Sequence, residues 1–286
     1  MSNVAQERRI GMHVRTGRGL DHAAEMIKTL QLQTVQIFTG NPSAWRSAPV
    51  DPKATALFKA ALEQMDVRPA MSHAMYLINL ASPNPNFQKK SREALKAELE
   101  RADAYGLQYV VTHVGSHMGD GPQAGIDRVV AQLDLILSAA GGPATCLLET
   151  SAGGGAYVGA KFEDLAQILS RLGQHAERLG VCLDTAHAYA SGYDVAGGEG
   201  MTRTLEELTA IVPAERIRAC HCNDTTVTLG GKADRHVNIG QGNVGLEGFR
   251  ALLHFDPLAH CAFVLETPGE EMLEGLENLN TLRALR

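Results

Sequence analysis

No stretch of this 286-residue sequence approaches the ~20 consecutive apolar residues that a membrane-spanning helix requires. The first residues, MSNVAQERRIGMHV, also lack the long apolar segment of a secretory signal peptide. We therefore expect a soluble, cytoplasmic protein with no membrane partner. A monomer is our default expectation for its oligomeric state.

Cysteine is scarce, and its five copies follow no disulfide or zinc-ribbon spacing. Cys220 and Cys222 flank His221, so strand alternation sends both to the face opposite that histidine. The other copies also lie in or beside predicted strands, at Cys146, Cys182 and Cys261. We expect reduced cysteines that fill space, and no Cys-rich metal site.

Positive charge is not in excess either. Lys and Arg total 26 against 32 Asp and Glu, which gives a formal net charge of −6. This balance gives no indication of a general nucleic-acid binder. It does not exclude one, because carboxylates that bind divalent cations no longer act as free negative charges.

Apolar runs alternate with amphipathic patterns along the whole chain. The helical pattern is clear at 23–30, 129–137 and 162–172, where apolar residues recur on one face. Gly106 and Gly173 stand where helices should end. Eight runs have the pattern of strands: residues 10–14, 34–38, 68–72, 109–112, 145–148, 181–183, 217–220 and 262–265. Eight alternating β and α units predict one α/β domain over residues 1–286, a (β/α)8 TIM barrel.

Histidines and carboxylates stand where the predicted strands end. In a barrel these carboxyl ends surround one mouth, so we expect the side chains to converge there. Nitrogen and oxygen ligands suit zinc or manganese, and nine are too many for one ion. We therefore predict a cluster of two or three ions with a bridging carboxylate. The nine candidate ligands are His73, His113, Glu149, Asp184, His187, His221, Asp234, His236 and Glu266.

The chain contains a series of longer motifs in the order IFTGNPSAWRSAP, SHAMYLINLASP, THVGSHMG, LLETSAGGG, VCLDTAHAYASGYD, CHCNDT, DRHVNIGQG and VLETP. In order and spacing they resemble the motifs of the endonuclease IV family, metal-dependent apurinic/apyrimidinic endonucleases with a xylose isomerase-like TIM barrel. The resemblance covers nearly the whole chain. DTxHxxxxGYD together with DRHxxxGxG is its most specific part, because the two loops serve one metal site from distant parts of the chain.

The resemblance implies a trinuclear zinc site, with manganese possible at some positions. It implies Glu149 as the catalytic carboxylate, which bridges two ions and helps to orient a metal-bound hydroxide. Several cations suit this chemistry, because phosphodiester hydrolysis builds negative charge on the phosphoryl oxygens. The implied ligand sets are His73, His113 and Glu149 for the first ion, Glu149, Asp184, His221 and Glu266 for the second, and His187, Asp234 and His236 for the third.

The implied substrate is damaged double-stranded DNA with an abasic site. Cleavage on its 5′ side would leave a 3′ hydroxyl and a 5′ deoxyribose phosphate, as in base excision repair, with trimming of blocked 3′ ends as a second activity. Such an enzyme would associate with the nucleoid when acting on DNA. The candidate DNA-binding residues are Trp45, Arg46, Tyr76, Asn79 and Arg235, although Trp45 and Tyr76 could also serve simple packing.

One position departs from the family pattern. Where the family usually carries Arg in an Asn-x-Arg-x-Trp segment that inserts into DNA, this chain has Ser43 between Asn41 and Trp45. Serine can neither wedge a base stack nor neutralise a phosphate. The departure bears on DNA affinity and substrate choice and leaves the predicted metal ligands intact.

Two other functions fit a barrel with such a mouth. A sugar isomerase or epimerase would bind one or two divalent ions and move a proton along a sugar. The third ligand set, His187 with Asp234 and His236, argues against it because a proton shuttle does not need a third ion. A non-catalytic DNA-binding or scaffold protein is the other alternative, and the intact ligand set argues against that.

Overall fold

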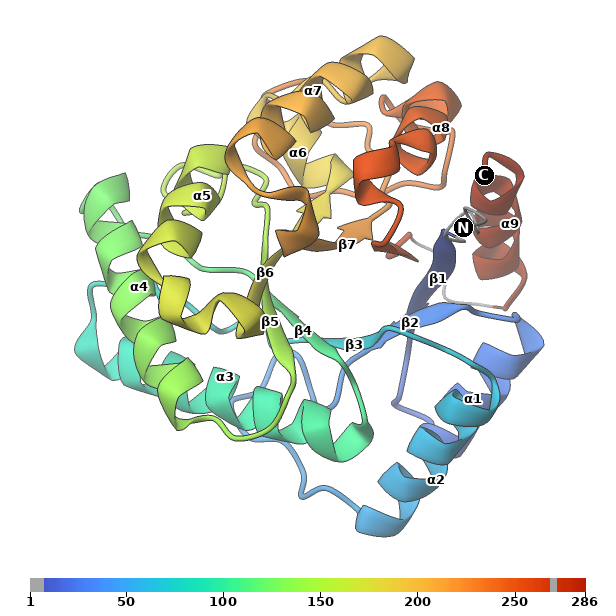
Figure 1. The fold of residues 1–286 in the computed structure, drawn as a ribbon, viewed down its shortest axis with the longest axis horizontal. Coiled ribbons are helices and arrows are strands. Elements are labelled where there is room, and N and C mark those ends of the chain that lie inside the picture. Colours follow the sequence, from blue (N-terminus) through green and yellow to red (C-terminus); the bar gives the residue numbers. More distant parts are fainter. Residues whose placement is uncertain (1–7, 268–271) are drawn as a thin grey trace, which may run out of the picture.

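The computed structural model describes residues 8–267 and 272–286. In this part of the chain eight parallel strands, β1 to β8, close into a barrel in sequence order, and β8 pairs with β1. The helices surround the strands as an outer ring (Figure 1). The predicted (β/α)8 TIM barrel is confirmed.

The elements follow one another along the chain as strand and helix. The strands are β1 (Arg9–Val14), β2 (Thr34–Ile37), β3 (Ala70–His73), β4 (Tyr109–Thr112), β5 (Thr145–Glu149), β6 (Leu179–Asp184), β7 (Ile217–His221) and β8 (Ala262–Leu265). The α-helices are α1 (Leu20–Thr29), α2 (Pro52–Gln64), α3 (Pro85–Tyr105), α4 (Pro122–Ala139), α5 (Phe162–Arg171), α6 (Thr185–Ser191), α7 (Gly197–Ile211), α8 (Gly245–His254) and α9 (Met272–Ala284). Short 3-10 helices are η1 (Gly173–Arg178), η2 (Ala214–Arg216) and η3 (Asp256–Leu258).

The predicted strands agree with these bounds to within two residues at either end. The three predicted helical faces belong to α1, α4 and α5, and most of their apolar residues are buried. Gly106 ends α3 in the left-handed conformation with φ 73°, as predicted. The prediction for Gly173 was wrong. Leu172 is the C-cap of α5, and Gly173 is the first residue of the 3-10 helix η1, which follows α5 directly.

Two hydrophobic layers hold the barrel together. Inside it, a small cluster that includes Met71, Val111 and Leu147 fills the lower interior. A much larger cluster lies between the strands and the helices. The cysteines are free and buried as predicted, and Cys220 and Cys222 pack in this outer layer, away from the barrel interior.

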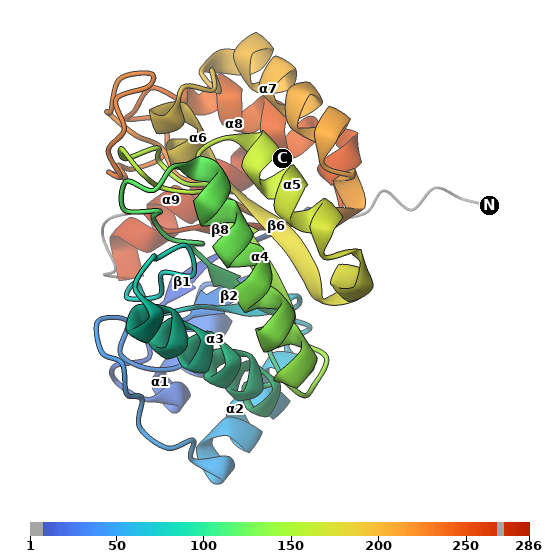
Figure 2. The same ribbon diagram turned by 90° about the vertical axis from the view of Figure 1, so that its left-hand side faces the viewer.

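The loops that follow the strands gather at one end of the barrel, on the left of Figure 2. The longest of them joins β7 to α8 and spans residues 222–244. Among the residues that the structure describes, no helix combines the length and apolar character needed to cross a membrane.

Candidate metal centre

A ring of polar side chains lies above the apolar interior, at the carboxyl ends of the strands. Strand alternation places it there: Val111 and Leu147 face the interior, and His113 and Glu149 come two residues later on the same face. Each strand supplies one such position. In chain order they are His13, Gln36, His73, His113, Glu149, Asp184, His221 and Glu266.

The first group of candidate ligands is built by β3, β4 and β5. The Nε2 atom of His73 and the Nδ1 atom of His113 each lie 3.2 Å from Glu149 Oε2. His73 Nδ1 lies 2.7 Å from the carbonyl oxygen of Ala74, which turns its Nε2 toward the carboxylate. These ligand atoms lie within 4.8 Å of one another, close enough to hold one metal ion.

The second group shares Glu149 with the first. His221 Nδ1 lies 2.8 Å from Glu149 Oε1, 3.2 Å from Glu266 Oε2 and 3.8 Å from Asp184 Oδ2. All four side chains offer ligand atoms within 4.8 Å of one another. One imidazole nitrogen therefore faces three carboxylates, and Glu149 is placed to bridge the two groups.

The third group depends on the short helix α6. Asp184 caps its N-terminus by accepting the backbone N–H of His187 at 2.7 Å, and this local bond fixes the Asp-x-x-His spacing. His187 and His236 form a compact group with Asp184. Asp234, expected as their partner, is also present: its Oδ1 lies 3.2 Å from His187 Nε2 and 3.1 Å from His236 Nε2.

The charges of the site favour cations. Burial alone would raise the pKa of Glu149, but His113 and His221 outweigh it and hold that pKa well below its usual range. Burial would lower the pKa of His187, but Asp184, Asp234 and Glu149 raise it to about 10. In the same way carboxylates overcome burial and raise the pKa of His236 to about 9. In the metal-free protein, protons on these histidines balance the ionised carboxylates.

Unpaired buried nitrogen atoms are a second sign that the residues fit metal ions. The Nε2 atoms of His187 and His236 are buried and have no aligned hydrogen-bond partner, although Asp234 Oδ1 lies close to both. Their Nδ1 atoms are engaged, with the carbonyl oxygens of Thr150 and Glu266 respectively. The two Nε2 atoms and Asp234 Oδ1 thus converge on one small space, as the donor atoms around a zinc ion do.

Sequence analysis missed two amides that hold the ligands. Gln36 on β2 is fully buried between His221 and Glu266. Asn223 lies just after β7, where its Nδ2 donates to Asp184 Oδ2 at 2.6 Å and to Glu266 Oε2 at 3.2 Å. Asn223 lies within CHCNDT, two residues past His221, so its place in that motif was the available signal. Gln36 gave no comparable signal.

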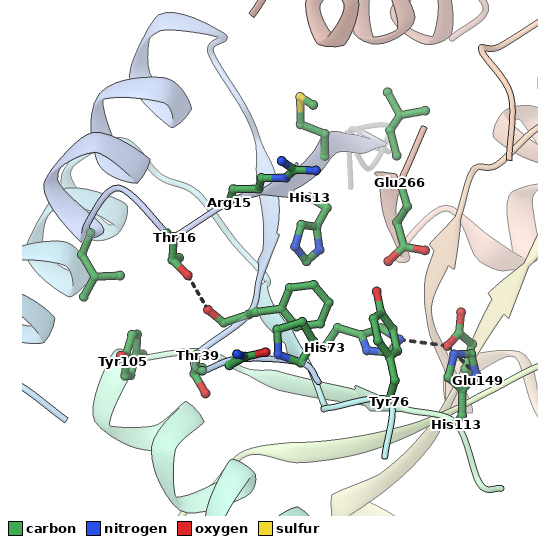
Figure 3. A pocket seen from close by; sticks show the side chains of 18 of the residues that line it. His13, Arg15, Thr16, Thr39, His73, Tyr76, Tyr105, His113, Glu149 and Glu266 are labelled. Carbon is green, nitrogen blue, oxygen red and sulfur yellow. Dashed lines mark hydrogen bonds and ion pairs between the residues drawn. The ribbon is translucent and has the colours of Figure 1, made fainter. Parts of the chain in front are cut away.

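A cavity of about 950 Å³ opens above the ligands (Figure 3). His73, His113 and Glu149 line it on one side, and Arg15 and Thr16 from the β1–α1 loop line it on another. The close-up shows Tyr76 standing over this space beside His73 and Glu149. Its ring makes an edge contact with Phe38 at 5.6 Å between centroids, and its side chain is exposed.

The other predicted DNA contacts differ in their surroundings. Trp45 packs against Phe87 of α3 with ring centroids 5.9 Å apart, and it does not line the cavity. Asn79 accepts the backbone N–H of Ser116 at 2.9 Å and so ties two loops together. Arg46 and Arg235 are exposed. The structure therefore brings the nine candidate ligands together, and the five residues predicted to contact DNA stay a prediction.

Comparison with known proteins agrees with this geometry. Residues 24–285 match the family model described as "Xylose isomerase-like TIM barrel". "Probable endonuclease 4" of Chloroflexus aurantiacus is 38% identical over 279 residues, which cover 97% of this chain and 98% of that protein. The chain belongs to the endonuclease IV family. The crystal structure of endonuclease IV from Thermus thermophilus superposes with a TM-score of 0.86 at 36% identity, over 97% of this chain and 98% of that one.

The barrel itself is shared more widely than the endonuclease IV family. A D-tagatose 3-epimerase-like protein matches with a TM-score of 0.73 at 19% identity, over 97% of this chain and 96% of that one. At that identity the likeness concerns the fold alone. Membership of the endonuclease IV family therefore comes from the full-length relatives above.

Proposed function

We propose that this endonuclease IV family member is a zinc-dependent DNA-repair enzyme that hydrolyses the phosphodiester 5′ to an abasic site. The observation that carries the proposal is the set of three ligand groups, linked through Glu149 and Asp184, at the floor of the cavity. The relatives named for endonuclease 4 support the same activity. We propose zinc at all three positions, with manganese as an alternative ion.

The proposed groups are the three implied by the family motifs, with Asp184 also near the third. His73, His113 and Glu149 would hold the first ion, and Glu149 with Asp184, His221 and Glu266 the second. The third would lie among His187, Asp234 and His236. When bound, such ions lower the pKa of water and stabilise charge on phosphoryl oxygens. In the proposed hydrolysis, the oxygen of water bonds to phosphorus and the P–O3′ bond breaks. The O3′ of the upstream nucleotide leaves with a proton, as a 3′ hydroxyl.

The protein side chains would orient the reactants. Glu149 contributes one oxygen to each of the first two groups, so its carboxylate fixes their separation. Although much of the Tyr76 side chain is exposed, partial desolvation and the nearby carboxylates of Glu266 and Glu149 raise its pKa to about 12, so its hydroxyl stays protonated. From its position over the cavity it would donate a hydrogen bond to a phosphate or sugar oxygen of the bound DNA.

The remaining DNA contacts are proposed at the rim. Arg46 and Arg235 would pair with phosphates, because both are exposed on loops at the carboxyl ends of the strands. Asn79 and Trp45 would shape the loops that carry these contacts. We propose that both also contact the DNA directly. The 3′-end trimming activity would use the same cavity and the same ligand groups.

The test is cleavage of a labelled duplex that contains one tetrahydrofuran abasic analogue, with the metal content of the protein counted beforehand. This analogue cannot undergo β-elimination, so a cut on its 5′ side means hydrolysis. We expect cleavage that disappears when metal is stripped and returns with zinc or manganese. Three ions per chain without cleavage would contradict the substrate, and one or two ions without cleavage would favour the sugar isomerase or epimerase.

A further inference from the structure

Two of the eight ring positions belong to none of the three ligand groups. They are His13 and Gln36, which stand opposite each other in the register of β1 and β2. Both face the barrel interior at the level of the candidate ligands, and His13 lines the cavity.

Gln36 contacts two ligands of the second group with the two ends of its amide. Its Oε1 lies 2.9 Å from His221 Nε2, and its Nε2 lies 2.5 Å from Glu266 Oε1. The same Nε2 lies 3.2 Å from His13 Nδ1. A buried side chain on β2 is thus bonded to ligands that come from β7 and β8.

The direction of these hydrogen bonds follows from the ligand group. His221 Nδ1 faces the carboxylates of Glu149, Asp184 and Glu266, so a metal ion there would take its lone pair. The ring proton must then sit on Nε2 and be donated to Gln36 Oε1. This sets the amide so that its NH2 group donates to Glu266.

His13 completes the chain as the acceptor of the second amide hydrogen. Burial lowers the pKa of His13 to about 4, so its ring is neutral and Nδ1 can accept. Its ring also packs against Phe38, with centroids 4.5 Å apart. Both hydrogens and the oxygen of the Gln36 amide therefore have partners, and the amide has one orientation.

We infer that Gln36 is a positioning residue for the second metal ion, which it acts on by fixing His221 and Glu266 from β2, with His13 bracing its amide. This inference rests on the proposed function, because it supposes that the second group binds an ion. The second ion would thereby depend on a residue outside its own ligand set. Partners of ligating residues typically change metal affinity by about 10–100-fold when they are removed.

The test compares Gln36→Met with the wild type. Methionine has a similar length but cannot accept from His221 or donate to Glu266. We expect the variant to lose one of three zinc ions per chain in a chelator competition, with the affinity for that ion about 10–100-fold weaker. Native mass spectrometry counts the ions that remain, and the chelator absorbance gives the affinity.

Thr34→Val is the matched control. Thr34 lies two residues earlier on the same strand, is also buried, and donates its hydroxyl to Pro69 O without touching a ligand. The Thr34→Val variant should keep all three ions. Gln36→Asn covers the case in which Gln36→Met does not fold, because it keeps a buried amide that is too short to join His221 to Glu266, and the same loss is expected.

The outcomes separate the inference from the proposed function. A folded Gln36 variant that keeps three ions with wild-type affinity would overturn the positioning role. Loss of an ion from Thr34→Val as well would overturn it too, since any buried polar loss in β2 would then suffice. A wild-type protein that binds no zinc would instead contradict the proposed function.

Discussion

Single residues in this site have more than one task. Asp184 caps α6 through the backbone N–H of His187, and its other oxygen lies near His221 and His236. Glu149 contributes an oxygen to each of the first two ligand groups. A substitution at such a residue should therefore change more than one metal position at once.

Glu149→Gln tests this sharing. We expect cleavage to fall by about three orders of magnitude or more, because the charge stabilisation that metal ions provide is worth several kcal/mol. We also expect fewer than three ions per chain, measured by mass spectrometry on the same sample. Glu98→Gln is the control, since Glu98 is buried but bonds to Thr39, outside the ligand groups. Equal losses in both variants would refute a special role for Glu149.

The raised pKa values of His187 and His236 predict that metal binding releases protons. With pKa values of about 10 and about 9 despite burial, both are protonated at neutral pH in the metal-free protein. A ligating imidazole must be neutral, so binding should release these two protons, and affinity should rise with pH up to about 9 to 10. Calorimetry in two buffers of different ionisation enthalpy counts the protons, and identical heats in both would contradict the expectation.

The same shifts set the pH dependence of the metal-free fold. The pKa values of both histidines are raised in the folded chain above about 6.5 in the unfolded one. Their contribution to stability is therefore complete below that unfolded value and is lost as pH rises through about 9 to 10. Bound metal should remove this loss.

At the scale of elements, Asp224 supports the loop that brings Asp234 and His236 to the site. This carboxylate is fully buried at the start of the β7–α8 loop. Its Oδ2 accepts the backbone N–H groups of Gly240 and Gly242, and its Oδ1 accepts that of Val244. One side chain thus closes a loop of about twenty residues, a length that otherwise costs considerable chain entropy.

Asp224→Asn should loosen this loop. The amide can present only one acceptor oxygen, so at least one backbone N–H loses its partner, at a cost of roughly 1–3 kcal/mol for each lost bond. We expect a lower free energy of unfolding in urea and faster amide hydrogen exchange over residues 225–244. Asp120→Asn, which removes only an exposed pair with Arg128, should cost less than about 1 kcal/mol. Unchanged exchange in the loop would rule out the bracing role.

The strands and the polar side chains at their carboxyl ends could be predicted from the sequence. Strand length and alternation identified β1 to β8, and histidines and carboxylates at strand ends are rare enough to stand out. Gln36 could not be found this way, because a glutamine in a strand is as easily a solvent-facing residue, and its partners on β7 and β8 become neighbours only when the barrel closes. Trp45 differs from Gln36 because its motif did give a signal, for a DNA contact. Its packing against Phe87 could not be predicted, because that contact depends on where α3 lies.

For the whole molecule, the formal net charge of −6 must be reconciled with the proposed DNA substrate. Four of the nine candidate ligands are carboxylates, and they gather at the mouth of the barrel. Three divalent ions would cancel the formal charge and place positive charge where the phosphate has to bind. DNA binding by this chain should therefore depend on metal as well as on its arginines.

Ser43 offers the sharpest test of how the whole surface meets DNA. It is exposed on the β2–α2 loop, and the adjacent Pro42 accepts the backbone N–H of Tyr76 at 3.0 Å. Ser43→Arg therefore adds a cation beside a residue that stands over the cavity. We expect abasic duplex to bind about fivefold to tenfold more tightly at ~0.1 M salt, with a slope of log affinity against log salt that is steeper by about 0.9.

The control is Ser138→Arg. Ser138 is exposed in the last turn of α4, at the opposite end of the barrel, so this variant adds the same charge far from the cavity. Anisotropy titrations with the metal-loaded proteins measure affinity and salt slope, and single-turnover cleavage should be nearly unchanged in both variants. Equal tightening by the two substitutions would mean that net charge governs binding. No tightening by Ser43→Arg would mean that DNA does not approach this loop, so recognition would have to rest on Tyr76 and the loops after β4 and β7.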